Sequence, residues 1–370
     1  MSTTALDRYY DVLGPEKIVH LFDPHTEMRG FVVIDNTACG PAIGGVRMAV
    51  DVSVDEVYRL ARAMTLKNAA AGLPHGGGKA GLIADPKGKN KASLVRSFAR
   101  SIRELTSYIP GPDMGTDETC MGLIWDEIGR SVGLPSVLGG IPLDKIGATG
   151  YGLARCAEVA SEFAGLKLKG ATLGIEGFGN VGRPAAQFLA ELGVRLVAAS
   201  DSKGAVYDAQ GIDIEKLIQT KDRTGTVTSY AGGKKMEAKD LFGVACDILI
   251  PAAKPDCINE RNVASIKAKL ILQGANIPAT HAAETTLRER GVFVVPDFIA
   301  NAGGVICASV EFHGGTQSLA FDMIAQRIRD NTRSVFTRSR DERISPRQAA
   351  VDLATERVRT AMAMRKKNGS

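Results

Sequence analysis

Hydrophobic and polar positions follow different patterns in the two parts of the chain. In the first third, short apolar runs mix with amphipathic helical stretches. FVVIDN (31–36) predicts a strand, and the stretch 53–72 predicts a helix that opens with a capping box from Ser53 to Glu56. Further helices are predicted over 91–106 and 117–132.

Beyond residue 150 the pattern changes to uniformly apolar runs separated by helices. A helix over 150–165 precedes ATLGIE (171–176), a Gly-rich turn, an apolar helix and VRLVAAS (194–200), which predicts a βαβ unit. Uniformly apolar strands predict a parallel sheet that is covered on both faces. Later strand candidates are 246–252, 270–275 and 292–297, and two final helices are predicted over 318–338 and 346–366.

A length of 370 residues predicts two domains, since domains commonly hold about 100–200 residues. The Gly/Pro-rich stretch 133–150 is typical of a crossing between them. We therefore expect an N-terminal domain over 1–145 and a dinucleotide-binding domain over 146–324. The helices in 325–370 are expected to dock back on the N-terminal domain.

Composition and charge exclude several classes of protein. Hydrophobic residues make up 44% and charged residues 24%, which is ordinary for a globular protein. The net charge of +5 is spread along the chain, so no nucleic-acid partner is expected. The N-terminus has no apolar run, and about 18 uncharged apolar residues never occur together, so neither export nor a membrane span is predicted. Six cysteines without C-x-x-C spacing argue against metal sites and disulfides and favour the cytoplasm.

A glycine-rich turn between the first two strands of the βαβ unit predicts a dinucleotide site. Glycines at G-x-G-x-x-G spacing permit a tight turn and a close approach to a pyrophosphate, which then lies at the positive end of a helix. Asp201 ends the next strand and favours NAD, whereas Ser200, Ser202 and Lys203 beside it would suit the 2′-phosphate of NADP, which stays possible. The turn residues are Gly177, Phe178, Gly179, Asn180, Val181 and Gly182.

Two lysines and an aspartate in the first third are candidates for chemistry. Lys67 falls on the apolar stripe of the helix 53–72, where it either extends toward solvent or meets a carboxylate. Lys79 follows three glycines, which let the backbone crowd a ligand or simply form a surface turn. Asp113 follows a proline, precedes a glycine by two residues, and lies just before a predicted helix, where a helix cap or turn residue would be unremarkable.

Seven spaced motifs give the chain a family resemblance. It resembles the glutamate/leucine/phenylalanine/valine dehydrogenases, and the matching stretches follow the family order over about residues 30–320. They are GPAIGGVRM (40–48), MTLKNAAAGLPHGGGKAG (64–81), GPDMGTDE (111–118), ATGYG (148–152), GFGNVG (177–182), QGAN (273–276) and NAGGV (301–305).

The resemblance implies a fold and a set of roles. The fold would be α/β, with an N-terminal α/β substrate and oligomerisation domain, a C-terminal doubly wound Rossmann-type NAD(P)-binding domain, and an active site in the cleft between them. Lys67 would bind the substrate α-carboxylate, Lys79 would activate water, and Asp113 would carry protons to and from the amine. Thr149, Asn276 and Asn301 would contact the nicotinamide end, and the enzyme would be a homo-oligomer without a metal.

The side-chain pocket departs from the glutamate-specific members of that family. Their lysine before the Gly-Gly pair is replaced by Ile43, and a serine is replaced by Ala308, one helical turn after Val305. A side-chain carboxylate would then lack a partner, so we expect an apolar amino acid such as leucine, valine or phenylalanine. The alternatives are a glutamate dehydrogenase that uses another cation, such as Arg47, and a catalytically silent NAD-binding regulatory subunit. Gly44 and Gly45 complete the predicted substrate pocket.

Overall fold

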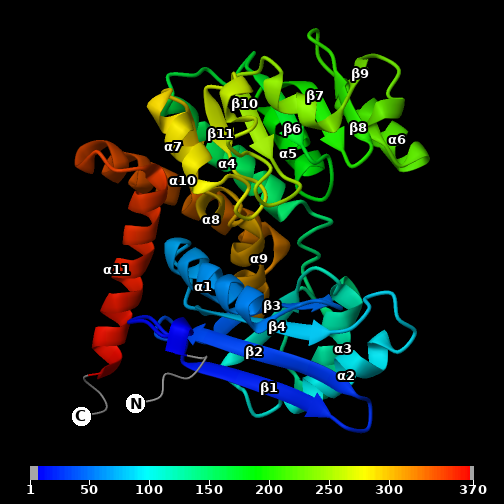
Figure 1. Cartoon of the computed structure of the whole chain (residues 1–370), viewed down its shortest axis with the longest axis vertical. Coiled ribbons are helices and arrows are strands. Elements are labelled where there is room, and N and C mark those ends of the chain that lie inside the picture. Colours follow the sequence, from blue (N-terminus) through cyan, green and yellow to red (C-terminus); the bar gives the residue numbers. More distant parts are fainter. Residues whose placement is uncertain (1–6, 367–370) are drawn as a thin grey trace. The chain divides into compact units, whose positions relative to one another are not determined.

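A computed structural model describes residues 7–366, which form two compact units. Of these residues, unit 1 contains 7–142, 305–320 and 351–366. Unit 2 contains Leu143–Gly304 and Phe321–Ala350. Each unit is an α/β fold around its own sheet (Figure 1). Residues 1–6 and 367–370 lie outside the described part of the chain. The ends of the two predicted domains fall on these residues, and so does part of the N-terminal stretch in which no export signal was predicted.

Unit 1 is built on a five-stranded mixed sheet in the order β1-β2-β4-β3-β5. β1 and β4 pair antiparallel with β2, whereas β3 runs parallel to both β4 and β5. Only β2 was predicted from the apolar pattern, because the other strands are rich in glycine or proline or are partly exposed. The strands are β1 (Lys17–Asp23), β2 (Met28–Asn36), β3 (Ala42–Ala49), β4 (Gly76–Ile83) and β5 (Tyr108–Pro112).

Helices cover both faces of this sheet. Phe31 and Val33 of β2 point toward α1, and Val32 and Ile34 point into the larger core beneath α2 and α3. Both faces of β2 are therefore buried, which explains its continuous apolar run. The helices are η1 (Asp7–Tyr9), α1 (Val54–Ala70), α2 (Lys91–Ser101), α3 (Glu118–Ile128) and η2 (Ser136–Leu138), joined by most of α9 (Gly303–Phe312) and α11 (Pro346–Lys366).

The three glycines before Lys79 are in a strand and not in a surface turn, which corrects one of the two interpretations of them. They open β4, which lies between β2 and β3. A Cβ atom on Gly77 would lie 2.0 Å from the backbone nitrogen of Thr65 on α1. The glycines therefore let α1 approach the sheet closely, and Lys79 is carried on a buried central strand.

Unit 2 is built on a seven-stranded sheet in the order β12-β11-β10-β6-β7-β8-β9. The first five of these strands are parallel, as the uniformly apolar runs predicted, and β8 and β9 extend the sheet antiparallel. The strands are β6 (Thr172–Glu176), β7 (Arg195–Asp201), β8 (Gly204–Tyr207), β9 (Lys234–Met236), β10 (Ile248–Pro251), β11 (Leu270–Leu272) and β12 (Phe293–Val295). The helices are α4 (Ala148–Phe163), α5 (Gly182–Glu191), α6 (Ile214–Thr224), η3 (Val227–Ser229), η4 (Ala238–Gly243), η5 (Val263–Ser265), α7 (His281–Glu289), α8 (Asp297–Ala300) and most of α10 (Gln317–Glu342).

The two C-terminal helices are divided between the units, whereas the sequence-based prediction assigned 325–370 to the N-terminal domain. α10 packs on α4 of unit 2, where Thr332 contacts Cys156 and Arg329 binds Glu158 at 2.6 Å. The later part of α11 packs on unit 1, where Arg357 donates to the carbonyl oxygens of Ala69, in the last turn of α1, and of Leu73, just beyond that helix. Burial of each segment against a different core decides this division.

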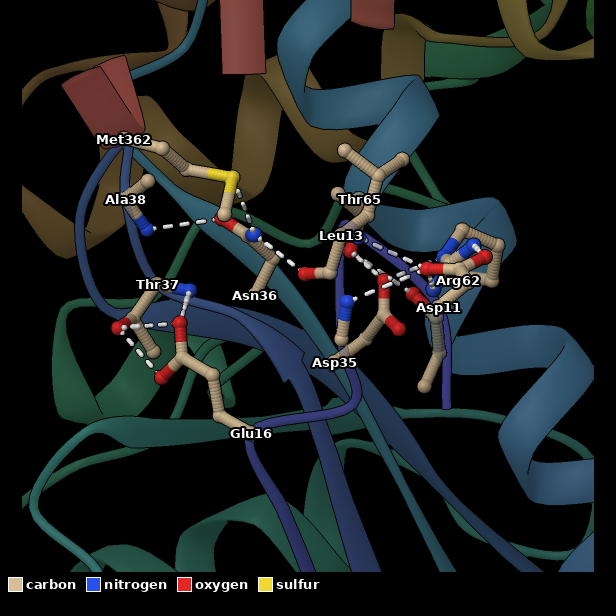
Figure 2. Close-up of polar contacts among 12 residues, drawn as sticks. Asp11, Leu13, Glu16, Asp35, Asn36, Thr37, Ala38, Arg62, Thr65 and Met362 are labelled. Carbon is tan, nitrogen blue, oxygen red and sulfur yellow. Dashed lines mark hydrogen bonds and ion pairs between the residues drawn. The ribbon is translucent and has the colours of Figure 1, made fainter. Parts of the chain in front are cut away.

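The segment before β1 is held to the rest of unit 1 by a polar cluster that is buried only in part (Figure 2). The Arg62 guanidinium on α1 donates to Asp11 at 2.6 and 2.9 Å and to Asp35 at 2.9 Å. Asn36 donates to the carbonyl oxygen of Leu13 at 2.7 Å. Burial raises the pKa of Asp35, although Arg62 opposes that shift.

Other global features concern the membrane and metals. Within residues 7–366, no helix has both the length and the apolarity that a bilayer crossing requires. The described side chains also contain no cluster of three or more potential metal ligands. All six cysteines are free thiols.

Candidate active site

Lys79 and Asp113 form a buried ion pair in unit 1. The Lys79 ammonium donates to one Asp113 carboxylate oxygen at 2.7 Å, and the side chains are only 7% and 16% exposed. Lys79 lies on β4, and Asp113 follows the carboxyl end of β5. The fold therefore joins two candidates that are 34 residues apart in the sequence.

Arg47 of β3 completes this group. Its guanidinium donates to the second oxygen of Asp113 at 2.7 Å and to Glu56 of α1 at 2.5 Å. Burial alone would raise the pKa of Asp113, but Lys79 and Arg47 together hold that pKa below its usual value. The Asp113 carboxylate is therefore ionised and faces two cations. The capping-box prediction holds only in part, because Ser53 accepts from the Glu56 backbone while the Glu56 side chain binds Arg47.

The Gly-Gly pair of β3 leaves room for this ion pair. A Cβ atom on Gly45 would lie 2.7 Å from Cβ of Asp113 and 3.2 Å from Nζ of Lys79. A Cβ atom on Gly44 would lie 1.6 Å from the Gly78 carbonyl oxygen of β4. Any side chain at either position would displace β4 or Asp113, so these glycines shape the site through their lack of a Cβ atom.

Lys67 lies in the last turn of α1 and is 8% exposed. It faces inward rather than extending to solvent, which excludes the snorkelling alternative. The apolar stripe predicted from the sequence runs through Leu60 and Met64, which are only half-buried. The buried face of α1 instead contains Ala61, Thr65 and Asn68.

The substituted specificity positions lie together in unit 1. Ile43 and Ala308 belong to one buried apolar cluster, with Ile109 of β5 and Val132 as its other members. Val305 is half-buried one turn before Ala308 on α9 and is not part of that cluster. The sequence motifs did not indicate Ile109 or Val132, because the cluster forms only when β3, β5 and α9 meet.

The predicted dinucleotide turn lies between β6 and α5 of unit 2. Gly177 has a positive φ of 92°, and a Cβ atom on Gly182 would lie 2.2 Å from the Gly177 carbonyl oxygen. Asn180 and Val181 complete the turn, and Phe178 is fully buried. A Cβ atom on Gly179 would meet no atom within 4 Å, so the turn is open on that side.

The open side of the turn faces a cavity of about 760 Å³ within unit 2. The cavity is lined by Gly177, Gly179, Asp201, Ser202 and residues of the loop after β10. Glycines without Cβ atoms at a helix N-terminus suit a pyrophosphate, so the residues present fit a dinucleotide.

Asp201 is more constrained than the sequence indicated. Its carboxylate accepts hydrogen bonds from the backbone nitrogens of Val227, at 2.7 Å, and Lys203, at 2.8 Å. The Nζ atom of Lys221, on α6, lies 3.6 Å from a carboxylate oxygen of Asp201. Lys221 and Lys239 both line the cavity. No motif indicated these two lysines, since they lie on separate elements after the βαβ unit.

The asparagines of the last motifs lie side by side in unit 2. Nδ2 of Asn301 lies 3.1 Å from Oδ1 of Asn276 and donates to the carbonyl oxygen of Gly274. Thr149 begins α4 nearby, since a Cβ atom on Gly304 would lie 3.2 Å from its hydroxyl oxygen. The structure therefore gathers the three residues expected at the nicotinamide end.

A dinucleotide-type parallel sheet with its glycine turn, together with a buried lysine–aspartate pair, defines a nicotinamide-dependent dehydrogenase. Two family models cover most of the chain. The glutamate/leucine/phenylalanine/valine dehydrogenase model matches residues 139–366, and the model of the family's dimerisation domain matches residues 15–130. The chain therefore belongs to the glutamate/leucine/phenylalanine/valine dehydrogenase family. It is an amino acid dehydrogenase, an oxidoreductase that uses NAD or NADP.

Individual relatives agree with this assignment. A glutamate dehydrogenase from Aeropyrum pernix is 42% identical and covers 89% of this chain and 85% of its own. The Leu-bound hetero-hexameric glutamate dehydrogenase from Thermus thermophilus has a TM-score of 0.85 at 28% identity, covering 97% and 95%. The L-tryptophan dehydrogenase from Nostoc punctiforme has a TM-score of 0.74 at 25% identity, covering 96% and 98%. Similar folds thus belong to proteins named for different amino acids.

Proposed function

We propose that this enzyme reversibly converts an L-amino acid into its 2-oxo acid and ammonia. The observation that carries the proposal is the buried Lys79–Asp113 ion pair, which connects β4 with the residue after β5 in unit 1. A carboxylate beside a cation can assist the hydrolysis of an imine, because the carboxylate can move protons to and from the reacting atoms. Belonging to the family supports the same reaction.

Each candidate residue takes one role in this proposal. Lys67, which is 8% exposed, binds the α-carboxylate, because an ammonium attracts a carboxylate strongly where little water is present. Lys79 activates the water that attacks Cα of the imine, and Asp113 takes up or returns the proton of the amine. Asn276 and Asn301 would hold the nicotinamide end of the cofactor, which would supply an acceptor for the hydride of Cα.

Glutamate is the substrate that the comparisons favour. Relatives at 35–42% identity are named glutamate dehydrogenases. If glutamate is the substrate, its side-chain carboxylate needs a cation. Arg47, the alternative that the sequence suggested, already binds Asp113 and Glu56.

An apolar amino acid is the second candidate, and one observation favours it. Ile43, Ile109, Val132 and Ala308 form a buried cluster without a charged or hydroxyl-bearing member. At this place an aliphatic side chain would gain about 25 cal/mol for each Å² of apolar surface that it buries. A carboxylate would lose its hydration there without gaining a partner.

The remaining expectations belong to the same proposal. Asp201 favours NAD as the cofactor, because its carboxylate would repel the 2′-phosphate of NADP. Lys221 and Lys239 line the same cavity, and their positive charge would attract that phosphate, so NADP remains the alternative. We also propose a homo-oligomer in the cytoplasm. One solved relative is described as a hetero-hexamer, in which different chains assemble together. Light scattering of this chain, purified without any other protein, tests whether it forms an oligomer with itself.

Two variants test the reaction. Lys79→Ala should lower turnover by at least about a hundredfold while NADH still binds as in the wild type, because the residue acts on the imine and not on the cofactor. Asp113→Asn keeps the shape and loses the proton carrier, so it should behave in the same way. Retention of more than about a tenth of wild-type turnover in Lys79→Ala would contradict the assigned role. NADH binding by the wild type without turnover of any of the twenty amino acids would favour a silent regulatory subunit.

A further inference from the structure

Arg347, in the first turn of α11, is the centre of a polar network within unit 2. Its Nε and Nη2 atoms donate to the two carboxylate oxygens of Glu284, each at 2.7 Å. Nη1 donates to Asp297 at 3.0 Å, and Nη2 also donates to the Gln273 side-chain oxygen at 2.8 Å. One guanidinium thus binds α7, the end of β11 and the start of α8. A planar fork with five donors is required for such a set of contacts.

The partners of Arg347 are themselves bound to one another. Gln273 donates to Glu284 at 2.7 Å and accepts from the backbone nitrogen of Asp297 at 3.0 Å. Gln273 is fully buried, and Asp297 is 6% exposed. Without Arg347, two carboxylates would remain in this low-dielectric region with no cation between them, which is costly.

The network extends to the loop that carries Asn276. The second carboxylate oxygen of Asp297 accepts from the backbone nitrogen of Ile277 at 2.9 Å. Ile277 has a φ of +48°, a left-handed conformation that a β-branched residue adopts only under constraint. Such strain persists only where the surroundings enforce it. Asp297, held by Arg347, therefore keeps the residue after Asn276 in its strained conformation.

Asn301 is held by the same elements. It ends the short helix α8, which begins at Asp297, and its backbone nitrogen donates to the Asp297 carbonyl oxygen at 2.8 Å. Its side-chain nitrogen contacts the carbonyl oxygens of Gly274 and Ala275. Its Oδ1 atom is buried and has no hydrogen-bond partner in the protein. A buried acceptor without a partner suits a donor such as a carboxamide.

We infer that Arg347 is a positioning residue for the nicotinamide end of the cofactor site, acting through Asp297 on the loops that carry Asn276 and Asn301. This inference rests on the proposed function, because it assumes that both asparagines contact the nicotinamide. A positioning role differs from a general stabilising role in which part of the cofactor site is affected when Arg347 is lost. Loss of Arg347 should weaken contacts to the nicotinamide half and leave the adenosine half of the site, on the other side of β6, unchanged.

Binding of NADH and of ADP-ribose, which lacks the nicotinamide, separates these two roles. Arg347→Met should raise the Kd of NADH at least about tenfold, as expected from lost charge-assisted hydrogen bonds, while the Kd of ADP-ribose changes less than about twofold. Arg347→Lys keeps the charge but cannot reach three partners at once, so it should weaken NADH binding by a smaller factor. Arg290→Met is the matched control. Arg290 donates to the carbonyl oxygens of Val263 and Ile266 in the same unit, and its loss should lower the melting temperature without changing either Kd.

Each outcome bears on the inference. A selective loss of NADH affinity in Arg347→Met, with partial recovery in Arg347→Lys, supports it. An equal loss for both ligands, or no loss for either, overturns it. If Arg347→Met does not fold, the same comparison is made with Arg347→Lys alone, where unchanged relative affinities overturn the inference. Failure of the wild-type protein to bind NADH would instead contradict the proposed function.

Discussion

The substrate pocket allows a quantitative test in which a charge partner is introduced for glutamate. The double variant Ile43→Lys with Ala308→Ser places an ammonium and a hydroxyl in the cluster that Ile109 and Val132 complete. Ile43 is 3% exposed and Ala308 is 6% exposed, so both substitutions change a place from which water is largely excluded.

The expected magnitude follows from the cost of burying an unpaired charge. Removal of one partner from a buried ion pair typically costs about 3–5 kcal/mol. The carboxylate of a glutamate substrate that contacts Ile43 and Ala308 would likewise be a buried charge without a partner. A leucine side chain would instead bury apolar surface there. From the pocket alone we expect the wild type to prefer leucine over glutamate by at least about a hundredfold in kcat/KM, which corresponds to about 2.7 kcal/mol. The double variant should reduce this ratio by raising glutamate turnover and lowering leucine turnover.

Initial rates of NADH and NADPH formation with leucine and glutamate measure this ratio. Ile43→Met is the control, because it keeps an apolar side chain of similar volume and should leave the ratio unchanged. Urea unfolding of each variant shows whether the new lysine only destabilises the protein. Efficient glutamate turnover by the wild type would refute the reasoning from the pocket and would support the first substrate candidate.

Three further predictions follow from single side chains. Gly179→Ala should weaken NADH binding with an unchanged melting temperature, because its Cβ atom would meet no protein atom within 4 Å. Gly182→Ala should lower the melting temperature, because its Cβ atom would lie 2.2 Å from a carbonyl oxygen. The opposite pattern would contradict the cofactor assignment of the turn. Burial lowers the pKa of His75 to about 4, so the unfolded chain binds a proton that the folded chain does not, and stability should fall as the pH drops from 6.5 toward 4. Urea unfolding at pH 7.5 and 5 should show a loss of about 2 kcal/mol from this group that His75→Leu abolishes, and an equal pH dependence in the variant would exclude His75 as the cause. Asp201→Ala should raise the use of NADP relative to NAD and lower the free energy of unfolding by about 1–3 kcal/mol, whereas a loss of stability with an unchanged cofactor ratio would restrict Asp201 to a structural role.

The parallel sheet of unit 2 was predictable because its strands are buried on both faces. Continuous apolar runs such as VRLVAAS therefore carry the signal of the strand in their own residues. Strands of unit 1 lack that signal. β4 reads as GGGKAGLI, and its glycines follow from the close approach of α1, which local patterning does not contain.

The candidate site was predictable in its parts and not in its connections. Lys67 and Lys79 are unusual residues for their local context, whereas Asp113 was indicated by the family motif around it. The motifs did not indicate that Arg47 binds Asp113, since that contact depends on the parallel register of β3 and β5. Lys221 was missed for a similar reason, because it reaches the cavity from a helix that has no motif.

The sequence by itself determined the residue types, the glycine turn and the family, because these are properties of short segments and of their order along the chain. Only the tertiary structure decided which groups share a site. Arg47 binds Asp113, which is 66 residues away in the sequence, and Arg347 binds Asp297, which is 50 residues away. Such contacts depend on strand order and helix packing, which are set by burial of the whole core. The apolar character of the Ile43 cluster likewise arises from three elements meeting.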